Sequence, residues 1–225
     1  MKKFCNSILE INKKILKKKI HYKYKKDKSA VSNLDLELEK EITKSIRFFF
    51  PDIDQIISEE NFKNEKLNKL DFKKPFAIFD PIDGTENFIS GLDMFGQTIS
   101  IRSFKKGYFD LIFLPKQNIM LTTKNILKKK RKNFLKITSV SSKMIGHRSK
   151  NIKNKDNYRI FGSLAFSFCA LLLGKINKID YSSKAKIWEY YTGLSLCKTA
   201  GFKIVCDNNR WYNNPKYKMK FSVCG

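Results

Sequence analysis

The chain has 225 residues, 42% of them hydrophobic, and no Gly-, Ser- or Pro-rich linker divides it, so we expect one domain over residues 1–225. Its five cysteines are odd in number and form no Cys-x-x-Cys pair, which argues against a disulfide framework and favours a reduced, cytoplasmic setting. No apolar signal segment opens the chain, and its longest apolar run, Leu164 to Leu173, is too short to span a bilayer. We therefore expect a soluble protein without membrane contact.

The formal net charge is +25, from 46 Lys and Arg against 21 Asp and Glu. Such a charge favours contact with nucleic acid or another polyanion, and the lysine-rich stretch from Lys124 to Lys136 is the best candidate for it. The competing explanation is an AT-rich genome, because Lys, Asn, Ile and Phe are abundant along the whole chain. In both cases the positive field should attract phosphorylated metabolites.

The N-terminal part predicts two amphipathic helices. Apolar residues recur at helical spacing from Phe4 to Leu16, and Lys23 to Lys28 is expected to be a basic loop. A second helix should follow, with Asn33 or Asp35 as its cap. Its buried side is predicted to carry Leu38, Ile42 and Ile46.

Later segments predict a β-hairpin and a buried helix. Residues 96–102 and 108–113 alternate like strands around a Lys-Lys-Gly turn, so a hairpin is expected there. The apolar run that ends at Leu173 should be a helix, which Gly174 stops.

An acidic motif after a short apolar strand carries most of the chemical information. Phe76 to Phe79 predicts a strand covered on both faces, and Asp80 follows where that strand is expected to leave the core. Pro81 holds Asp80 extended. Gly84 then permits a tight turn that brings Asp83 back beside Asp80.

Two carboxylates held this close repel each other unless a cation lies between them, and all-oxygen ligands favour Mg²⁺ over zinc. The turn from Gly84 to Asn87 is expected to open a helix whose free N–H groups favour a bound phosphate. A bare Asp-x-x-Asp is also common in surface turns, but the strand before it and the glycine after it favour a metal site next to a phosphate site.

The sequence Asp80-Pro81-Ile82-Asp83-Gly84-Thr85 closely resembles the signature of the inositol monophosphatase family, whose superfamily includes fructose bisphosphatases and adenosine bisphosphate nucleotidases. The resemblance covers roughly residues 29–202. It implies an α+β fold, a layered αβαβα sandwich, and Mg²⁺-dependent hydrolysis of a small phosphorylated metabolite. A homodimer and sensitivity to Li⁺ are further expectations from the family.

Segments before the motif fit the same family. Val31-Ser32 and Asp35 match a Val-Thr-x-x-Asp segment, and the Glu-Glu pair that begins at Glu59 resembles a family element that follows a short strand. By this resemblance Glu59 is a metal ligand shared with Asp80. Thr85, paired with Asp35, and Glu59 would orient and deprotonate the attacking water.

Segments after the motif also fit, with one substitution. Gly162 and Ser163 match a turn that borders the family's substrate pocket. Trp188-Glu189 matches a Trp-Asp dipeptide at a strand end, with Glu in place of Asp. Because the extra methylene moves the carboxylate by about 1 Å and Mg²⁺ tolerates little geometric error, a weakened second metal site is expected.

The sequence departs from the family pattern at three places, which affect the expected substrate and the expected layers of the fold. Inositol phosphatases of the family carry an acidic residue where this chain has Tyr181 and Ser182, and Asp180 is the nearest carboxylate. A Gly-rich hairpin expected near residues 124–136 is missing from the sequence, and the chain stops at Gly225, where family members usually continue into a last helix. We therefore expect the sandwich to lack that helix.

The candidate metal ligands are Glu59, Asp80, the Ile82 carbonyl, Asp83 and Glu189. The candidate catalytic residues are Glu59, Thr85 and Asp35. The candidate substrate-binding residues are Gly84, Thr85, Gly162, Ser163, Asp180 and Ser182. Inositol monophosphate is the favoured substrate, with adenosine bisphosphate and histidinol phosphate as alternatives. A catalytically degenerate member that binds polyanions or serves as a scaffold is the other class of function left open.

Overall fold

The computed structural model describes residues 1–62, 70–126, 135–144 and 157–224. Its helices are α1 (Lys2–Ile15), α2 (Asn33–Phe49), α3 (Thr85–Ile89), α5 (Leu164–Leu172) and α6 (Ile187–Thr199), with a 3-10 turn, η2, at Ser142–Met144. Its strands are β1 (Tyr22–Tyr24), β2 (Ala30–Ser32), β3 (Gln55–Ser58), β4 (Phe76–Asp83), β5 (Gly96–Ser103), β6 (Gly107–Leu114), β7 (Ile119–Thr122), β8 (Ile137–Val140), β9 (Asn157–Arg159), β10 (Lys178–Lys186), β11 (Lys203–Cys206) and β12 (Lys218–Cys224).

The first large sheet has the strand order β3-β4-β5-β6-β7, with β3 parallel to β4 and the other pairs antiparallel. Side chains of β4 alternate between two cores, with Phe76 and Ile78 packed among residues of α5 and α6. Ala77 and Phe79 instead join the core that α1 and α2 form on the other face. The predicted burial of this strand on both faces is confirmed, as is the predicted β5–β6 hairpin beside it.

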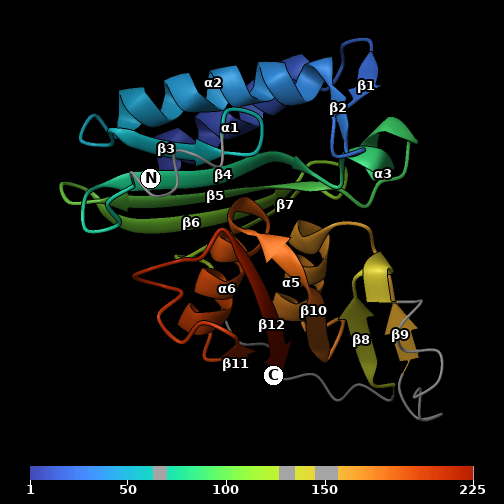
Figure 1. Cartoon of the computed structure of the whole chain (residues 1–225). Coiled ribbons are helices and arrows are strands. Elements are labelled where there is room, and N and C mark those ends of the chain that lie inside the picture. Colours follow the sequence, from blue (N-terminus) through green and yellow to red (C-terminus); the bar gives the residue numbers. More distant parts are fainter. Residues whose placement is uncertain (63–69, 127–134, 145–156, 225) are drawn as a thin grey trace.

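The second large sheet has the order β11-β12-β10-β8-β9. Helices α5 and α6 lie between the two sheets, and α1 and α2 cover the outer face of the first sheet (Figure 1). The α+β class and the alternation of helical and sheet layers are therefore confirmed. The described residues form four layers, α, β, α and β, and none of their helices covers the outer face of the second sheet.

The entry into α2 differs from the expectation. Ser32 is the N-cap, not Asn33 or Asp35, because its hydroxyl accepts hydrogen bonds from the N–H groups of Leu34 and Asp35. Asp35 closes a capping box by accepting the N–H of Ser32 at 2.8 Å. The capping box fixes the direction of the Asp35 carboxylate.

The segment before α2 also differs. Lys23 to Lys28 was expected to be a loop, but its first residues belong to β1, which pairs with β2 in a hairpin. The turn between these strands contains Lys28 with a φ of 65°. The remaining basic residues thus lie in a hairpin turn held by its two strands.

Strand β4 continues past the point where it was expected to leave the core. Its register with β5 shifts between Asp80 and Asp83, which marks a β-bulge at Pro81 and Ile82. Proline lacks an N–H group and is tolerated at such a bulge. The bulge, followed by Gly84 with a φ of 89°, sets the spacing of the two carboxylates, so the glycine turn alone does not.

Several strands were not predicted, including β7 and most of the second sheet. Many of their residues are polar or charged, and alternation in β10 buries only Ile179 and Ala185.

Among the described residues, no helix is long and apolar enough to cross a membrane. All five cysteines are free. The central part of the lysine-rich stretch, residues 127–134, lies outside the described residues.

Gly193 lies where α6 packs against α5, and a Cβ placed there would lie 2.0 Å from the Phe168 ring. We expect Gly193→Ala to lower the free energy of unfolding by about 2 kcal/mol, because overpacking a core costs roughly 1–3 kcal/mol and outweighs the better helix propensity of Ala. Urea unfolding measures the change. Adding Phe168→Leu should recover part of the loss, whereas an unchanged stability for Gly193→Ala would contradict this packing.

Candidate active site

A cavity of about 190 Å³ opens at the end of β4 that carries Asp80 and Asp83. It is lined by residues from seven separated segments. These residues are Ser29, Ala30, Glu59, Asp80, Ile82, Asp83, Gly84, Thr85, Glu86, Ser139, Val140, Ser141, Ser142, Phe161, Gly162, Ser163, Leu164, Ser167, Tyr181 and Glu189. The structure therefore brings all the candidate metal ligands together, along with four of the six candidate substrate-binding residues.

Asp83 is held at the beginning of α5. Its Oδ2 accepts the hydroxyl of Ser163 at 2.7 Å and the N–H of Ala165. Ser163 is itself the N-cap of α5. Burial raises the pKa of Asp83 to about 6, although these hydrogen bonds and the positive end of the helix favour the charged form. The side chain is thus fixed in direction and costly to charge.

Asp80 and Glu189 show the same conflict between burial and charge. Asp80 is 1% exposed, and burial together with the neighbouring Glu59 and Asp83 raises its pKa well above the usual range. Glu189 was expected at a strand end but lies in the first turn of α6, three residues beyond the end of β10 at Lys186, whose N–H it accepts. Burial, and then repulsion from Asp83 and Glu59, raises the pKa of Glu189 to about 7.

The donor set fits a hard divalent cation. Four carboxylates and the Ile82 carbonyl offer only oxygen atoms, and the raised pKa values mean that a cation among them would relieve their repulsion. Across the described ranges, no three His, Cys, Asp or Glu side chains stand close enough to enclose a metal in their present rotamers. Asp83 faces Ser163 and Glu59 faces two lysines, so metal binding would require side chains to turn.

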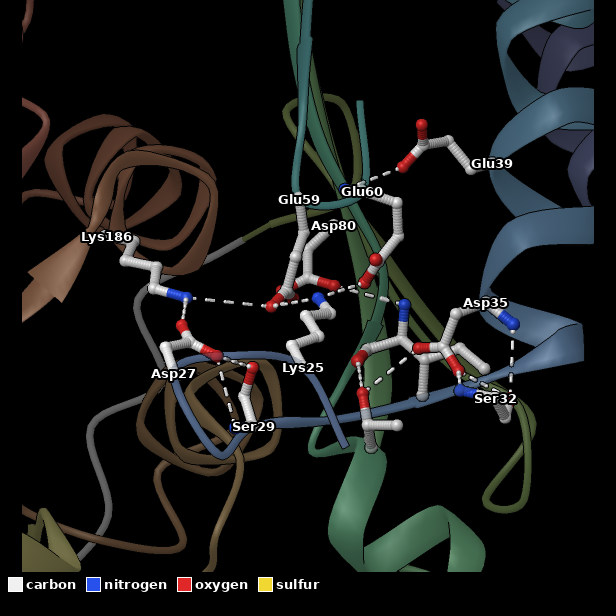
Figure 2. Close-up of polar contacts among 12 residues, drawn as sticks. Lys25, Asp27, Ser29, Ser32, Asp35, Glu39, Glu59, Glu60, Asp80 and Lys186 are labelled. Carbon is white, nitrogen blue, oxygen red and sulfur yellow. Dashed lines mark hydrogen bonds and ion pairs between the residues drawn. The ribbon is translucent and has the colours of Figure 1, made fainter. Parts of the chain in front are cut away.

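Thr85 connects the cavity to α2. Its hydroxyl oxygen lies 3.0 Å from Asp35 Oδ1 and 3.0 Å from the Ile82 carbonyl oxygen, and its one proton serves either acceptor. Asp35 is held in turn by the N–H and hydroxyl of Ser32 (Figure 2). Burial raises the pKa of Asp35. The predicted Thr85–Asp35 pair is present.

Two lysines lie beside Glu59, and neither was expected there from the sequence. Lys25 Nζ lies 3.3 Å from Glu59 Oε1 and 2.6 Å from Glu60 Oε1, and Lys186 Nζ lies 3.8 Å from Glu59 Oε1 (Figure 2). The Glu60 N–H donates to Glu39, whose pKa is raised to about 7 by burial. The one signal for Lys186 was its place directly before the Ile-Trp-Glu sequence.

Asp180 and Ser182 are not brought to this cavity. They line a separate depression of about 240 Å³ together with residues of β11 and β12. Because side chains alternate along β10, it is Tyr181 between them that reaches the main cavity. The expected position of Asp180 and Ser182 beside the substrate is therefore corrected. Cavity residues that the sequence reasoning missed include Ser139, Ser141, Ser142, Phe161 and Tyr181.

Comparison with known proteins agrees with this geometry. The sequence model of the inositol monophosphatase family matches residues 3–222. The chain belongs to the inositol monophosphatase family. The resemblance inferred from the Asp80–Thr85 motif is thus confirmed, and the match extends well beyond that motif.

Relatives in this family carry several names. Nus factor SuhB of Pasteurella multocida is 25% identical over 199 residues, which cover 80% of this chain and 72% of that protein. The 3'(2'),5'-bisphosphate nucleotidase CysQ of Haemophilus influenzae is 29% identical over 98 residues, covering 44% of this chain and 36% of that protein. A crystal structure of an IMPase/NADP phosphatase with Mg²⁺ and phosphate superposes with a TM-score of 0.77 at 13% identity and covers 99% of this chain and 87% of that one.

The acidic cluster should make the metal-free protein less stable as pH rises. Below about pH 4, Asp80 is protonated in both folded and unfolded states and contributes no penalty. Because its folded pKa is raised, stability is lost as pH rises from that value through the folded pKa. We expect Asp80→Asn, whose amide oxygen still accepts the Ile82 N–H, to have a higher Tm than the parent at pH 7.

Thermal unfolding in the presence of a chelator, from pH 4 to pH 7, measures this difference. The gain in Tm should shrink toward pH 4. Asp54→Asn, which changes an exposed carboxylate in the same way, is the control and should show no such pH dependence. A destabilised Asp80→Asn at pH 7 would show that repulsion does not dominate the cluster.

Proposed function

We propose that this chain is a Mg²⁺-dependent phosphomonoesterase that hydrolyses a small phosphorylated metabolite, with inositol monophosphate as the first candidate. The observation that carries the proposal is the meeting of Glu59, Asp80, Asp83 and Glu189 in one cavity beside Thr85. Support comes from relatives named as phosphatases and from the similar fold that was crystallised with Mg²⁺ and phosphate.

In this proposal the metal is held by Glu59, Asp80, Asp83, Glu189 and the Ile82 carbonyl. Bound Mg²⁺ supplies charge that stabilises the phosphoryl oxygens and lowers the pKa of water. Main-chain N–H groups of Gly84 and Thr85, with Gly162 and Ser163 across the cavity, would position the phosphate.

Thr85 and Asp35 would orient the attacking water. When the Thr85 hydroxyl donates its proton to Asp35, its lone pairs are left to accept a proton of that water. The capping box holds Asp35 in place, so the Thr85 oxygen points in one direction. Glu59 borders the same cavity and would accept the proton that the water releases.

Phosphate release from inositol, nucleotide, sugar and histidinol phosphates, with and without Mg²⁺, tests the proposal. We expect Asp80→Asn to abolish Mg²⁺-dependent turnover and Thr85→Val to lower kcat by about 10²-fold, the lower range for a lost acid–base contact. The exposed Asp54→Asn should retain the parent activity. If the parent protein is folded but shows no Mg²⁺-dependent turnover of any substrate, the proposed enzymatic function is wrong.

The panel also addresses the substrate. Adenosine bisphosphate and histidinol phosphate remain alternatives to inositol monophosphate, because Tyr181 reaches the cavity where inositol phosphatases carry an acidic residue, and the neighbouring Asp180 lines a separate depression. The shifted carboxylate of Glu189 is expected to weaken one metal position, so Glu189→Asp should lower the Mg²⁺ concentration needed for half-maximal turnover. A homodimer, a cytoplasmic location and Li⁺ sensitivity stay predictions from the family.

A second function, polyanion binding by a degenerate member, is favoured by two observations. The net charge is +25, and two relatives bear the name Nus factor SuhB. Salt-sensitive RNA binding that survives Asp80→Asn and Asp83→Asn, in a protein without turnover, would favour this function over the enzyme.

A further inference from the structure

Glu59 is contacted by two ammonium groups from different parts of the chain. Lys25 lies in the turn between β1 and β2, and Lys186 ends β10. The three side chains are largely shielded from water, with exposures of 24% for Lys25, 22% for Lys186 and 16% for Glu59. Figure 2 shows both ammonium groups directed at the Glu59 carboxylate, next to Asp80.

The hairpin turn presents Lys25 in a defined position. The Lys25 N–H donates to the Ser29 carbonyl at 2.8 Å, and the Lys28 N–H donates to the Lys25 carbonyl at 2.9 Å. Asp27 accepts both the N–H and the hydroxyl of Ser29 inside the turn. The hydrogen bonds within the turn therefore fix the backbone position of Lys25.

Lys186 is positioned as firmly. Its Nζ lies 3.6 Å from Asp27 Oδ2 and 5.4 Å from the centre of the Trp188 ring, in addition to its contact with Glu59. Its backbone N–H donates a hydrogen bond to Glu189. Lys186 therefore contacts two candidate metal ligands, Glu189 through its backbone and Glu59 through its side chain. A side-chain substitution at Lys186 leaves that backbone contact available.

Each lysine has a second carboxylate with which it forms an ion pair. Lys25 lies 2.6 Å from Glu60, and Lys186 lies 3.6 Å from Asp27. Both are therefore able to leave Glu59 without becoming buried, unpaired charges, which would be strongly unfavourable. The contact with Glu59 is thus one that a competing cation is able to displace.

We propose that Lys25 and Lys186 form a cation clamp on Glu59 that competes with the divalent metal for this carboxylate and so lowers the metal affinity of the site. The clamp rests on the proposed role of Glu59 as a metal ligand. A divalent ion at Glu59 would stand within a few ångströms of two positive charges, and at that distance the repulsion in a partly buried site is large. The lysines thereby act as positioning residues that raise the metal concentration needed to load the enzyme.

Calorimetric titration of the full chain with Mn²⁺ and with Mg²⁺ tests the clamp. The titration gives both the number of bound ions and their affinity. We expect Lys25→Met and Lys186→Met each to bind metal about tenfold more tightly than the parent, because one repelling charge is removed. Lys184→Met is the matched control, since Lys184 is exposed on the same strand as Lys186, and its affinity should stay within about twofold. Circular dichroism of each metal-free variant establishes that it is folded.

In a Glu59→Gln background the lysine substitutions should alter metal affinity much less than in the parent, because the carboxylate for which metal and lysines compete is gone. Unchanged or weaker binding in both lysine variants would overturn the clamp. If Asp80→Asn also loses binding, the proposed metal site stands and only the clamp is wrong. Absence of metal binding in the parent and in both lysine variants would overturn the clamp and the proposed site together, whereas binding that appears only after a lysine is removed would support the clamp.

Discussion

Mutual repulsion among buried carboxylates is the constraint on which this site depends. Asp80, Asp83, Glu59 and Glu189 reach one cavity from three segments, and burial raises the pKa of Asp80, Asp83 and Glu189. A phosphate group is itself an anion, so it would be repelled by these side chains unless positive charge is added between them. The geometry thus favours chemistry in which a cation arrives before or with the substrate.

The layered fold offsets part of this cost. Helices α5 and α6 both begin at the cavity, and their first residues hold Asp83 and Glu189 through Ser163, Ala165 and the Lys186 N–H. Helix N-termini carry partial positive charge that stabilises nearby carboxylates. Since both helices are packed between the two sheets, their ends are fixed in position. The acidic cluster is therefore held by the same layer that forms the larger core.

Around Glu59 the chain supplies formal charge instead of helix ends. Lys25 and Lys186 contact this carboxylate, and Asp27 and Glu60 give each lysine an alternative partner. The site thus has one half organised by backbone N–H groups and one half organised by lysines, and the two halves should respond differently to metal.

Local patterns in the sequence determined a large part of this protein. Helical spacing from Phe4 to Leu16 and from Leu38 to Ile46, the apolar run of β4 and the Asp80–Thr85 motif each express a structure within a few residues. The family and the α+β class followed from them, as did the candidate metal ligands and four of the six candidate substrate-binding residues that line the cavity, because a specific motif indicates which distant segments should accompany it.

Only the tertiary structure decided the remaining features. Whether Asp180 or Tyr181 faces the cavity depends on the register of β10 with its neighbours, and a shift of one residue exchanges the two faces of a strand. The contacts of Lys25 and Lys186 with Glu59 join segments far apart in the chain. The residues next to these lysines in the sequence do not distinguish them from the many other lysines. The bulge after Asp80 likewise arises from pairing with β5, which the residues of β4 alone do not specify.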